Sequence, residues 1–364
     1  MKNKLRVGII GCGAVATSRH IPGFTRLGKN VMVQAVCDTN YSLACRAATK
    51  FGIHKIYSDA SQMLANELAD GGLDIVDICT PPHTHAQLTV EALRSGCHVL
   101  LEKPMALTVA DCDTMIDAAK RYNRKICIVH NVLFHPPLIK ARKLVAEGAI
   151  GDVTGVRVLL SDPTHEMIMR EDYWIHKLPG GLIGETGPHP VYLSLAFMDK
   201  VVEVEVTAKN VLDNHPWAPF DEFRIELDGE RTTSSILVSY SGNRYMATMD
   251  ILGTKGALWL DLQGMIVVKY GAMPKLNPIR VARRAWDTAD QIENGVMGNA
   301  VKVATGRMRL GHDTVIERFV DSVMRGTEPP VTGEEGREVI RVMELVVERL
   351  REKYRDKYPV GSNR

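Results

Sequence analysis

An acid and a base stand four residues apart in "GGLIGETGPH", residues 180–189, a stretch that holds four glycines. Histidine ionises near neutral pH, so it can accept a proton from a substrate, and a neighbouring carboxylate can orient its ring. Glu185 and His189 are therefore either a catalytic pair or part of a charged turn. The apolar run "VYLSLAFM" follows directly, which makes the segment the expected entry to a helix.

A second segment with reactive side chains is "LLEKPMAL", residues 100–107. It ends an apolar run that predicts a buried strand. Ligands of open α/β sheets bind beyond the carboxyl ends of the strands, which places Glu102 and Lys103 where they could face a bound nicotinamide. The alternative is a surface lysine in a turn that Pro104 terminates.

The segment "GIIGCGAVA", residues 8–16, has the pattern of a dinucleotide-binding loop. The pattern requires a tight turn at one glycine, close approach of a pyrophosphate at a second, and a small residue where helix and strand pack. Free N–H groups at the start of the helix would bind the phosphates. The residues expected to contact the cofactor here are Gly11, Gly13, Ala14, Val15 and Ala16.

Asp38 supports this interpretation, because it ends the next apolar run, "VMVQAVCD". An acid at this point accepts hydrogen bonds from the adenosine ribose hydroxyls. No arginine is adjacent, and a 2′-phosphate would meet the carboxylate, so NAD is favoured over NADP. Arg46, one helical turn further on, leaves NADP as the less favoured alternative.

The elements that must position these residues follow from the pattern of apolar runs. Up to about residue 130, short apolar runs alternate with amphipathic helical stretches, which is typical of βαβ units and a parallel sheet buried on both faces. After about residue 150, alternating strands follow one another with short turns and predict an antiparallel sheet. Two helical patterns end the chain.

A basic segment, residues 275–310, interrupts the second half. It holds seven basic and three acidic residues, with apolar residues at spacings of three and four, so a helix would have one apolar face. Packing on another subunit or on the second domain is the favoured role, with a lid over the active site and a membrane surface as alternatives.

The composition excludes several classes of protein. The chain has 364 residues, enough for two domains, and a net charge of +2, which argues against a nucleic-acid partner. All seven cysteines lie before residue 128 without a CxxC spacing, as expected of reduced thiols in a cytoplasmic protein. No apolar stretch reaches 18 residues, so we expect neither export nor a membrane span.

Taken together, "GCGAVA", "CTPPHTHAQLTVEALRSGCHVLLEKPMAL" and "GGLIGETGPH" resemble the Gfo/Idh/MocA family of NAD(P)-dependent oxidoreductases. The resemblance implies an α/β protein with an N-terminal Rossmann domain, a doubly wound parallel sheet, over 1–131. It implies a C-terminal α+β domain over 132–364, whose large open, mainly antiparallel sheet forms a wall of the substrate site. It also implies homodimers or homotetramers.

The resemblance further implies roles for the reactive residues. Lys103 matches the lysine near the reacting hydroxyl, Glu102 the acid beside the nicotinamide ribose, and His189 the histidine that takes the substrate proton. Glu185 stands where most members have an aspartate, so it could orient the histidine or reach the substrate.

Three further segments are weaker candidates. The loop after "DICT" lies near the cofactor by resemblance, a more favoured role than a metal site formed by "HTH", and no metal is expected; its candidate residues are Thr80, Pro81, Pro82 and His85. Asn131 follows a predicted strand and could line the substrate site. Trp174 could pack on a sugar ring, or belong to the core or an interface.

The sequence thus supports three hypotheses. The favoured one is an NAD-dependent dehydrogenase that oxidises a secondary hydroxyl of a sugar, sugar derivative or polyol such as inositol. The second is a glycosidase of the same fold that oxidises a hydroxyl transiently and recycles NAD. The third is a non-catalytic regulator that senses NAD or a sugar.

Overall fold

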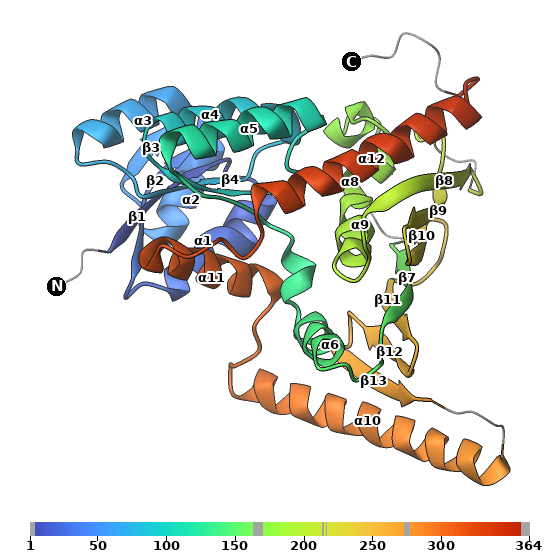
Figure 1. Ribbon diagram of the computed structural model, residues 1–364. Coiled ribbons are helices and arrows are strands. Elements are labelled where there is room, and N and C mark those ends of the chain that lie inside the picture. Colours follow the sequence, from blue (N-terminus) through green and yellow to red (C-terminus); the bar gives the residue numbers. More distant parts are fainter. Residues whose placement is uncertain (1–3, 163–169, 213–214, 216, 273–276, 358–364) are drawn as a thin grey trace. The chain divides into compact units, whose positions relative to one another are not determined.

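A computed structural model describes residues 4–162, 170–212, 215, 217–272 and 277–357 (Figure 1). The chain forms two compact units. The first unit comprises residues 1–131 and 311–341, and the second comprises residues 132–310 and 342–364. The chain passes into the second unit after residue 131 and returns to the first unit at residue 311.

The first unit is built on a parallel six-stranded sheet with the order β3-β2-β1-β4-β5-β6. The strands are β1 (Leu5–Ile10), β2 (Val31–Cys37), β3 (Lys55–Tyr57), β4 (Ile75–Ile78), β5 (His98–Leu101) and β6 (Ile126–Ile128). Figure 1 shows helices on both faces of this sheet. The connecting elements are η1 (Ala16–His20), α1 (Ile21–Arg26), α2 (Tyr41–Phe51), α3 (Ala60–Ala69), η2 (Pro82–Thr84), α4 (His85–Arg94), α5 (Val109–Tyr122) and η3 (Asn131–Phe134).

Local sequence explains where these helices begin and end. Asp59 caps α3 by accepting the Gln62 N–H at 2.7 Å, and Thr108 caps α5 by accepting the Asp111 N–H at 3.1 Å. Helix α2 ends at Gly52 in the left-handed conformation (φ +69°), which glycine adopts without strain. The βαβ pattern and the parallel sheet predicted from the sequence are therefore confirmed.

The first unit is completed by chain from the far end of the sequence. Helix α11 (Gly311–Arg325) and the first part of α12 (Gly333–Lys353) belong to it. The Ile128 N–H donates to the Val331 carbonyl at 3.4 Å, and the backbone at Gly336 lies against Ile128. A boundary drawn by sequence alone misses this return, because nothing local shows which sheet a late helix covers.

The second unit is built on a seven-stranded sheet with the order β13-β12-β11-β7-β10-β9-β8. Its strands are β7 (Val153–Ser161), β8 (Val201–Lys209), β9 (Glu222–Gly229), β10 (Thr233–Ser239), β11 (Met246–Gly253), β12 (Gly256–Asp261) and β13 (Ile266–Gly271). Neighbouring strands are antiparallel except β7 and β10, which pair in parallel. The expected mainly antiparallel sheet is confirmed, and the parallel pair makes it mixed.

The helices of the second unit are mostly short. They are α6 (Pro136–Ala146), η4 (Trp174–Lys177), α8 (Leu182–Thr186), α9 (Pro188–Leu195) and α10 (Pro278–Ala304), together with the last part of α12. Helix α10 lies in the basic segment and confirms the helix predicted there. In the parts of the chain that the structure describes, no helix combines the length and apolar character needed to cross a membrane.

Candidate active site

The fingerprint loop after β1 has the geometry that its glycines predict. Gly11 has φ +92°, and a Cβ there would lie 2.7 Å from the carbonyl oxygen of Cys79, so only glycine fits this turn. A Cβ at Gly13 would meet nothing within 4 Å, which leaves the backbone open to a ligand. Ala16 is fully buried where the helix starts.

Asp38 is tied to this loop through both carboxylate oxygens. Oδ2 accepts the Cys12 N–H at 2.8 Å, and Oδ1 accepts the Asn40 N–H at 2.8 Å. Each oxygen has a second lone pair that can accept a hydroxyl proton. The open backbone at Gly13 and the fixed carboxylate therefore fit the pyrophosphate and the adenosine ribose of NAD, the cofactor predicted from the sequence.

The loop that holds Thr80, Pro81 and Pro82 is fixed by its own side chains. The Thr80 and Thr84 hydroxyls are 2.7 Å apart. His85 is fully buried, with Nε2 2.8 Å from the Thr80 carbonyl oxygen and Nδ1 2.9 Å from that of Pro104. Burial lowers the pKa of His85, while its contacts with the two carbonyl oxygens act in the opposite direction. The ring connects the end of β4 to the segment that follows β5.

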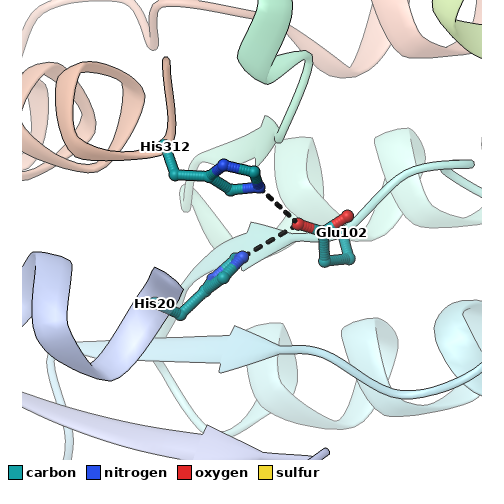
Figure 2. A group of neighbouring side chains, drawn as sticks. All are labelled: His20, Glu102 and His312. Carbon is teal, nitrogen blue, oxygen red and sulfur yellow. Dashed lines mark hydrogen bonds and ion pairs between the residues drawn. The ribbon is translucent and has the colours of Figure 1, made fainter. Parts of the chain in front are cut away.

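Glu102 follows β5 and lies at the centre of a hydrogen-bonded cluster (Figure 2). Its Oε1 accepts a hydrogen bond from Nε2 of His20 at 2.8 Å and lies 3.6 Å from Nε2 of His312. Its Oε2 accepts the backbone N–H of Lys103 at 3.0 Å. The carboxylate thereby fixes the segment that carries the predicted reactive lysine, whose peptide bond to Pro104 is cis.

His20 joins Glu102 to a second acid, Asp77 on β4. Its Nδ1 lies 3.0 Å from both carboxylate oxygens of Asp77, and His20 and Asp77 are both fully buried. Burial alone would lower the pKa of His20, but the Asp77 carboxylate outweighs it, and the net pKa is well above its usual value. His20 is therefore an imidazolium at neutral pH.

Glu102 is charged for a matching reason. Burial raises the pKa of the Glu102 carboxyl group. The hydrogen bond from His20 and the nearby His312 ring lower it by more, so the net pKa is well below its usual range. A cation thus lies between two buried carboxylates, which satisfies the requirement that buried charges be paired. We call His20, Asp77, Glu102 and His312 the Glu102 cluster.

Helix α11 supplies the last member of this cluster. Nδ1 of His312 lies 3.4 Å from Nδ2 of Asn131, the residue predicted to line a substrate site. The sequence contained a signal for Asp77, because an acid inside the apolar run "DIVDIC" must be paired when buried. It contained none for His20 or His312, since partners 82 and 210 residues from Glu102 meet only in the folded unit.

Some side chains of this cluster also lie close enough together to bind a metal ion. His20, Glu102 and His312 offer ligand atoms within 4.8 Å of one another, as do His20, Asp77 and Cys79. Nε2 of His20 is already committed to Glu102 and Nδ1 to Asp77, so an ion would have to displace a proton that two carboxylates hold. Among the described residues, these hydrogen bonds are typical of side chains that share protons.

His189 lies in the second unit, in the first turn of α9. Its Nδ1 is 2.6 Å from the Tyr192 hydroxyl, which also accepts the Val132 N–H at 3.3 Å. The imidazole is half-buried, and Tyr192 is buried. Glu185, half-buried in α8, precedes it by one turn. The tyrosine that fixes the ring was not predicted from the sequence.

Close packing holds α8 and α9 in place. A Cβ at Gly187 would lie 2.4 Å from the Ile183 carbonyl oxygen and 2.7 Å from Cε of Met343. Farther along α9, the buried hydroxyls of Ser194 and Ser234 are 2.8 Å apart and join the helix to β10. Gly187 of "GGLIGETGPH" therefore allows neighbouring groups to pack closely next to His189.

Trp174 begins the 3₁₀ turn η4 that precedes this segment. It is half-buried, and its ring centroid lies 5.9 Å from that of Tyr173.

Lys103 is half-buried in the first unit, whereas Trp174, Glu185 and His189 belong to the second. The predicted site residues thus form two groups, each described within its own unit.

The fold and the fingerprint loop define the class of protein. Residues 5–130 match the family model for the oxidoreductase family with an NAD-binding Rossmann fold, and residues 138–259 match the GFO/IDH/MocA C-terminal domain. The chain belongs to the GFO/IDH/MocA family, as its motifs predicted, and its first domain is an NAD-binding domain.

The similar curated proteins include a sugar-nucleotide reductase and glycosyl hydrolases, according to their names. The chain is 30% identical over 264 residues to dTDP-3,4-didehydro-2,6-dideoxy-alpha-D-glucose 3-reductase of Streptomyces violaceoruber, covering 71% of this chain and 72% of that protein. It is 28% identical over 305 residues to a glycosyl hydrolase family 109 protein of a Shewanella species, covering 74% and 66%. For several other curated relatives the match spans only 43–64% of their length.

A solved structure shows the same fold over the whole chain. The WlbA dehydrogenase of Bordetella pertussis, crystallised with NADH and UDP-GlcNAcA, superposes with a TM-score of 0.79. The alignment covers 97% of each chain at 21% sequence identity. At this identity the similarity establishes the fold alone.

Proposed function

We propose that this protein is an NAD-dependent oxidoreductase that oxidises a secondary hydroxyl of a sugar, a sugar derivative such as a nucleotide-linked sugar, or a polyol. The observation that carries the proposal is the fixed Glu102–Lys103 segment, which belongs to the same unit as the fingerprint loop and Asp38. The family match supports the cofactor, and the named relatives support the substrate class.

In this proposal NAD, when bound, supplies the carbon that accepts hydride. The protein's residues manage the proton and the substrate. The Lys103 ammonium orients the reacting hydroxyl and stabilises negative charge that develops on its oxygen. His189 accepts the hydroxyl proton, and Glu185 contacts the substrate or the imidazole. Asn131 and Trp174 are proposed to contact the substrate.

The contact between His189 and Tyr192 suggests which nitrogen is the base. The Tyr192 oxygen has lone pairs for two donors, and the Val132 N–H uses one. If Nδ1–H of His189 donates to the other, Nε2 carries a lone pair and can accept the substrate proton. We therefore propose Tyr192 as the positioning residue that selects the reactive tautomer of His189.

The test is NADH formation, followed at 340 nm, over inositols, aldoses, sugar phosphates and nucleotide sugars. For a substrate that is turned over, we expect Lys103→Ala and His189→Ala to lower kcat at least about 100-fold. Lys140→Ala and His54→Ala, both at exposed positions, are the matched controls. Unchanged kcat in Lys103→Ala or His189→Ala would refute the mechanism.

Tyr192→Phe tests the tautomer separately. We expect kcat to fall about tenfold with KM nearly unchanged, and the acidic limb of the pH profile to move, because the ring loses its fixed orientation. A Tyr192→Phe enzyme with the wild-type pH profile would contradict this role.

The similarity to a glycosyl hydrolase family 109 protein favours one alternative, a glycosidase that recycles NAD. Such an enzyme would release a free sugar from a glycoside without net NADH. Net NADH with a free sugar or polyol favours the dehydrogenase, whereas ligand binding without either reaction favours a sensor.

A further inference from the structure

The second unit contains a cavity of about 320 Å³. One side of it is formed by residues 176–178 and 180–182, at the turn η4 and the start of α8. The other sides are formed by residues 217–220, by Phe223 of β9 and by Arg351 near the end of α12. Pockets that hold small molecules commonly measure about 300–1,000 Å³, so this cavity is large enough for a ligand.

The residues assigned to the reaction and to the cofactor do not form this cavity. Trp174, Glu185 and His189 are not among the described residues that line it. Lys103 and Asp38 belong to the first unit. The cavity is therefore a separate feature of the second unit, and neither the cofactor nor the proposed reaction accounts for it.

Aromatic side chains form one wall of the cavity. Trp217 is half-buried, and Phe220 and Phe223 are buried, with ring centroids 6.1 Å apart and ring planes 77° apart. The Tyr354 ring lies 4.8 Å from that of Phe220, and the His215 ring lies 5.3 Å from that of Trp217, measured between centroids. These contacts hold the wall in place, and aromatic faces and edges of this kind bind flat rings.

Two cations line the cavity without a matching acid. Lys177 and Arg351 are exposed, and no aspartate or glutamate is among the described residues that line the cavity. Neither cation forms an ion pair with another residue in the described parts of the chain. His176 also lines the cavity, and its Nε2 lies 3.0 Å from the Arg170 carbonyl oxygen. The cavity thus carries two positive charges that an anionic ligand would neutralise.

We propose that this cavity is a binding site for a small organic anion with a flat ring, such as an aromatic carboxylate. The ring packs against Trp217 and Phe220, and the anionic group accepts hydrogen bonds from Arg351 and Lys177. A guanidinium donates two parallel N–H groups to a carboxylate or a phosphate, which gives direction as well as energy. The proposal concerns binding and does not depend on the proposed reaction.

The aromatic wall and the two cations together select this class of ligand. A neutral aromatic ligand would cover the cations without pairing with them, and burying an unpaired charge costs free energy. A bare anion would pair with the cations but leave the aromatic wall in contact with water. A ligand that combines a flat ring with an anionic group makes both contacts.

The test is isothermal titration calorimetry of the full chain with four probes. Benzoate and phenyl phosphate combine a ring with an anion, and we expect at least one of them to bind with a dissociation constant below about 1 mM. Benzyl alcohol lacks the charge and inorganic phosphate lacks the ring, so each should bind at least about tenfold more weakly. The tighter of benzoate and phenyl phosphate identifies the anionic group that the cavity prefers.

Two substitutions locate the bound probe. Arg351→Glu reverses one of the charges and Trp217→Leu removes an aromatic ring, so each should raise the dissociation constant of the probe at least about tenfold. Arg280→Glu and Trp286→Leu make the same changes at exposed positions on α10, outside the cavity, and are the matched controls. Both controls should bind the probe with the wild-type constant.

Circular dichroism and titration with NAD control for folding. Because the fingerprint loop belongs to the first unit, Arg351→Glu and Trp217→Leu should bind NAD with the wild-type constant. Asp38→Ala should weaken NAD binding and leave probe binding unchanged, which separates the cavity from the cofactor site. The proposal fails if neither benzoate nor phenyl phosphate binds below about 1 mM, if benzyl alcohol binds as tightly as they do, or if Arg351→Glu binds the probe like the wild type.

Discussion

At the scale of single residues, the unusual feature is a charged histidine sealed between two carboxylates. His20 is completely buried, and both of its ring nitrogens are bonded to acids. A buried imidazolium of this kind is stable only while the carboxylates beside it stay charged. Its position beside Glu102 means that the same charges that complete the core also fix the backbone of Lys103.

Replacing His20 tests how much of the first unit depends on this cation. His20→Gln leaves Asp77 and Glu102 buried without the charge between them, and we expect the free energy of unfolding to fall by about 3–5 kcal/mol. Urea unfolding at pH 7 measures it, with the exposed His54→Gln as control. In the double variant His20→Gln/Asp77→Asn the loss should be smaller than the sum of the single losses, whereas strict additivity would show that the charges are not coupled.

His98, at the start of β5, predicts a loss of stability in mild acid. Burial, with the charges of Arg124 and Lys125, lowers the pKa of His98 to about 4, and its Nδ1 accepts the Lys125 N–H at 3.0 Å. The unfolded chain takes up this proton near pH 6.5, before the folded chain does. The contribution of His98 is therefore full above pH 6.5 and is lost as the pH falls toward 4.

The matching variant is His98→Gln, which retains a side-chain acceptor for the Lys125 N–H but does not ionise. Between pH 7 and pH 4.5 it should lose about 1–2 kcal/mol less stability than the wild-type protein, a figure reduced for the partial exposure of the ring. Urea unfolding at several pH values measures this, and identical slopes for the two proteins would refute the assignment.

At the scale of elements, the segment that carries His189 depends on helices in close contact. Gly187 joins α8 to α9 and lies against α12 through Met343. Gly187 of "GGLIGETGPH" thus has a packing function. The imidazole is positioned by this contact and by Tyr192, three residues further along the helix.

Gly187→Ala tests the contact. The added methyl would clash with the Ile183 carbonyl and with Met343, so we expect a loss of about 1–3 kcal/mol in the free energy of unfolding. Gly298→Ala on α10 is the matched control, since a Cβ there meets nothing within 4 Å and should stabilise the helix slightly. Equal effects of the two substitutions would contradict the packing argument.

At the scale of the whole molecule, the chain crosses from the first unit to the second and back. Residues 311–341 bring His312 to Glu102 and cover the sheet with buried Val315, Ile316 and Phe319. The first unit is therefore complete only after the last two helices of the chain have been synthesised.

A fragment of residues 1–131 tests this dependence. Without α11 and α12 it exposes apolar surface and leaves Glu102 without His312, so we expect a broad, non-cooperative thermal transition and strong binding of a hydrophobic dye. Adding residues 311–341 through a short glycine-serine linker should restore a cooperative transition. If residues 1–131 alone unfold as sharply as the full chain, the return of the chain is dispensable for folding.

The sequence alone determined the parts of this protein whose signals are local. Apolar runs, helix caps and the fingerprint at Gly11 depend on neighbouring residues, so the parallel sheet, the second sheet and the family could be predicted. Only the tertiary structure decided which distant side chains meet. His20, Asp77 and His312 surround Glu102, and Tyr192 holds His189, because burial forces each polar group to find a partner and the fold determines which one is in reach. "GGLIGETGPH" predicts that a histidine acts there, and the packed helices determine how its ring is held.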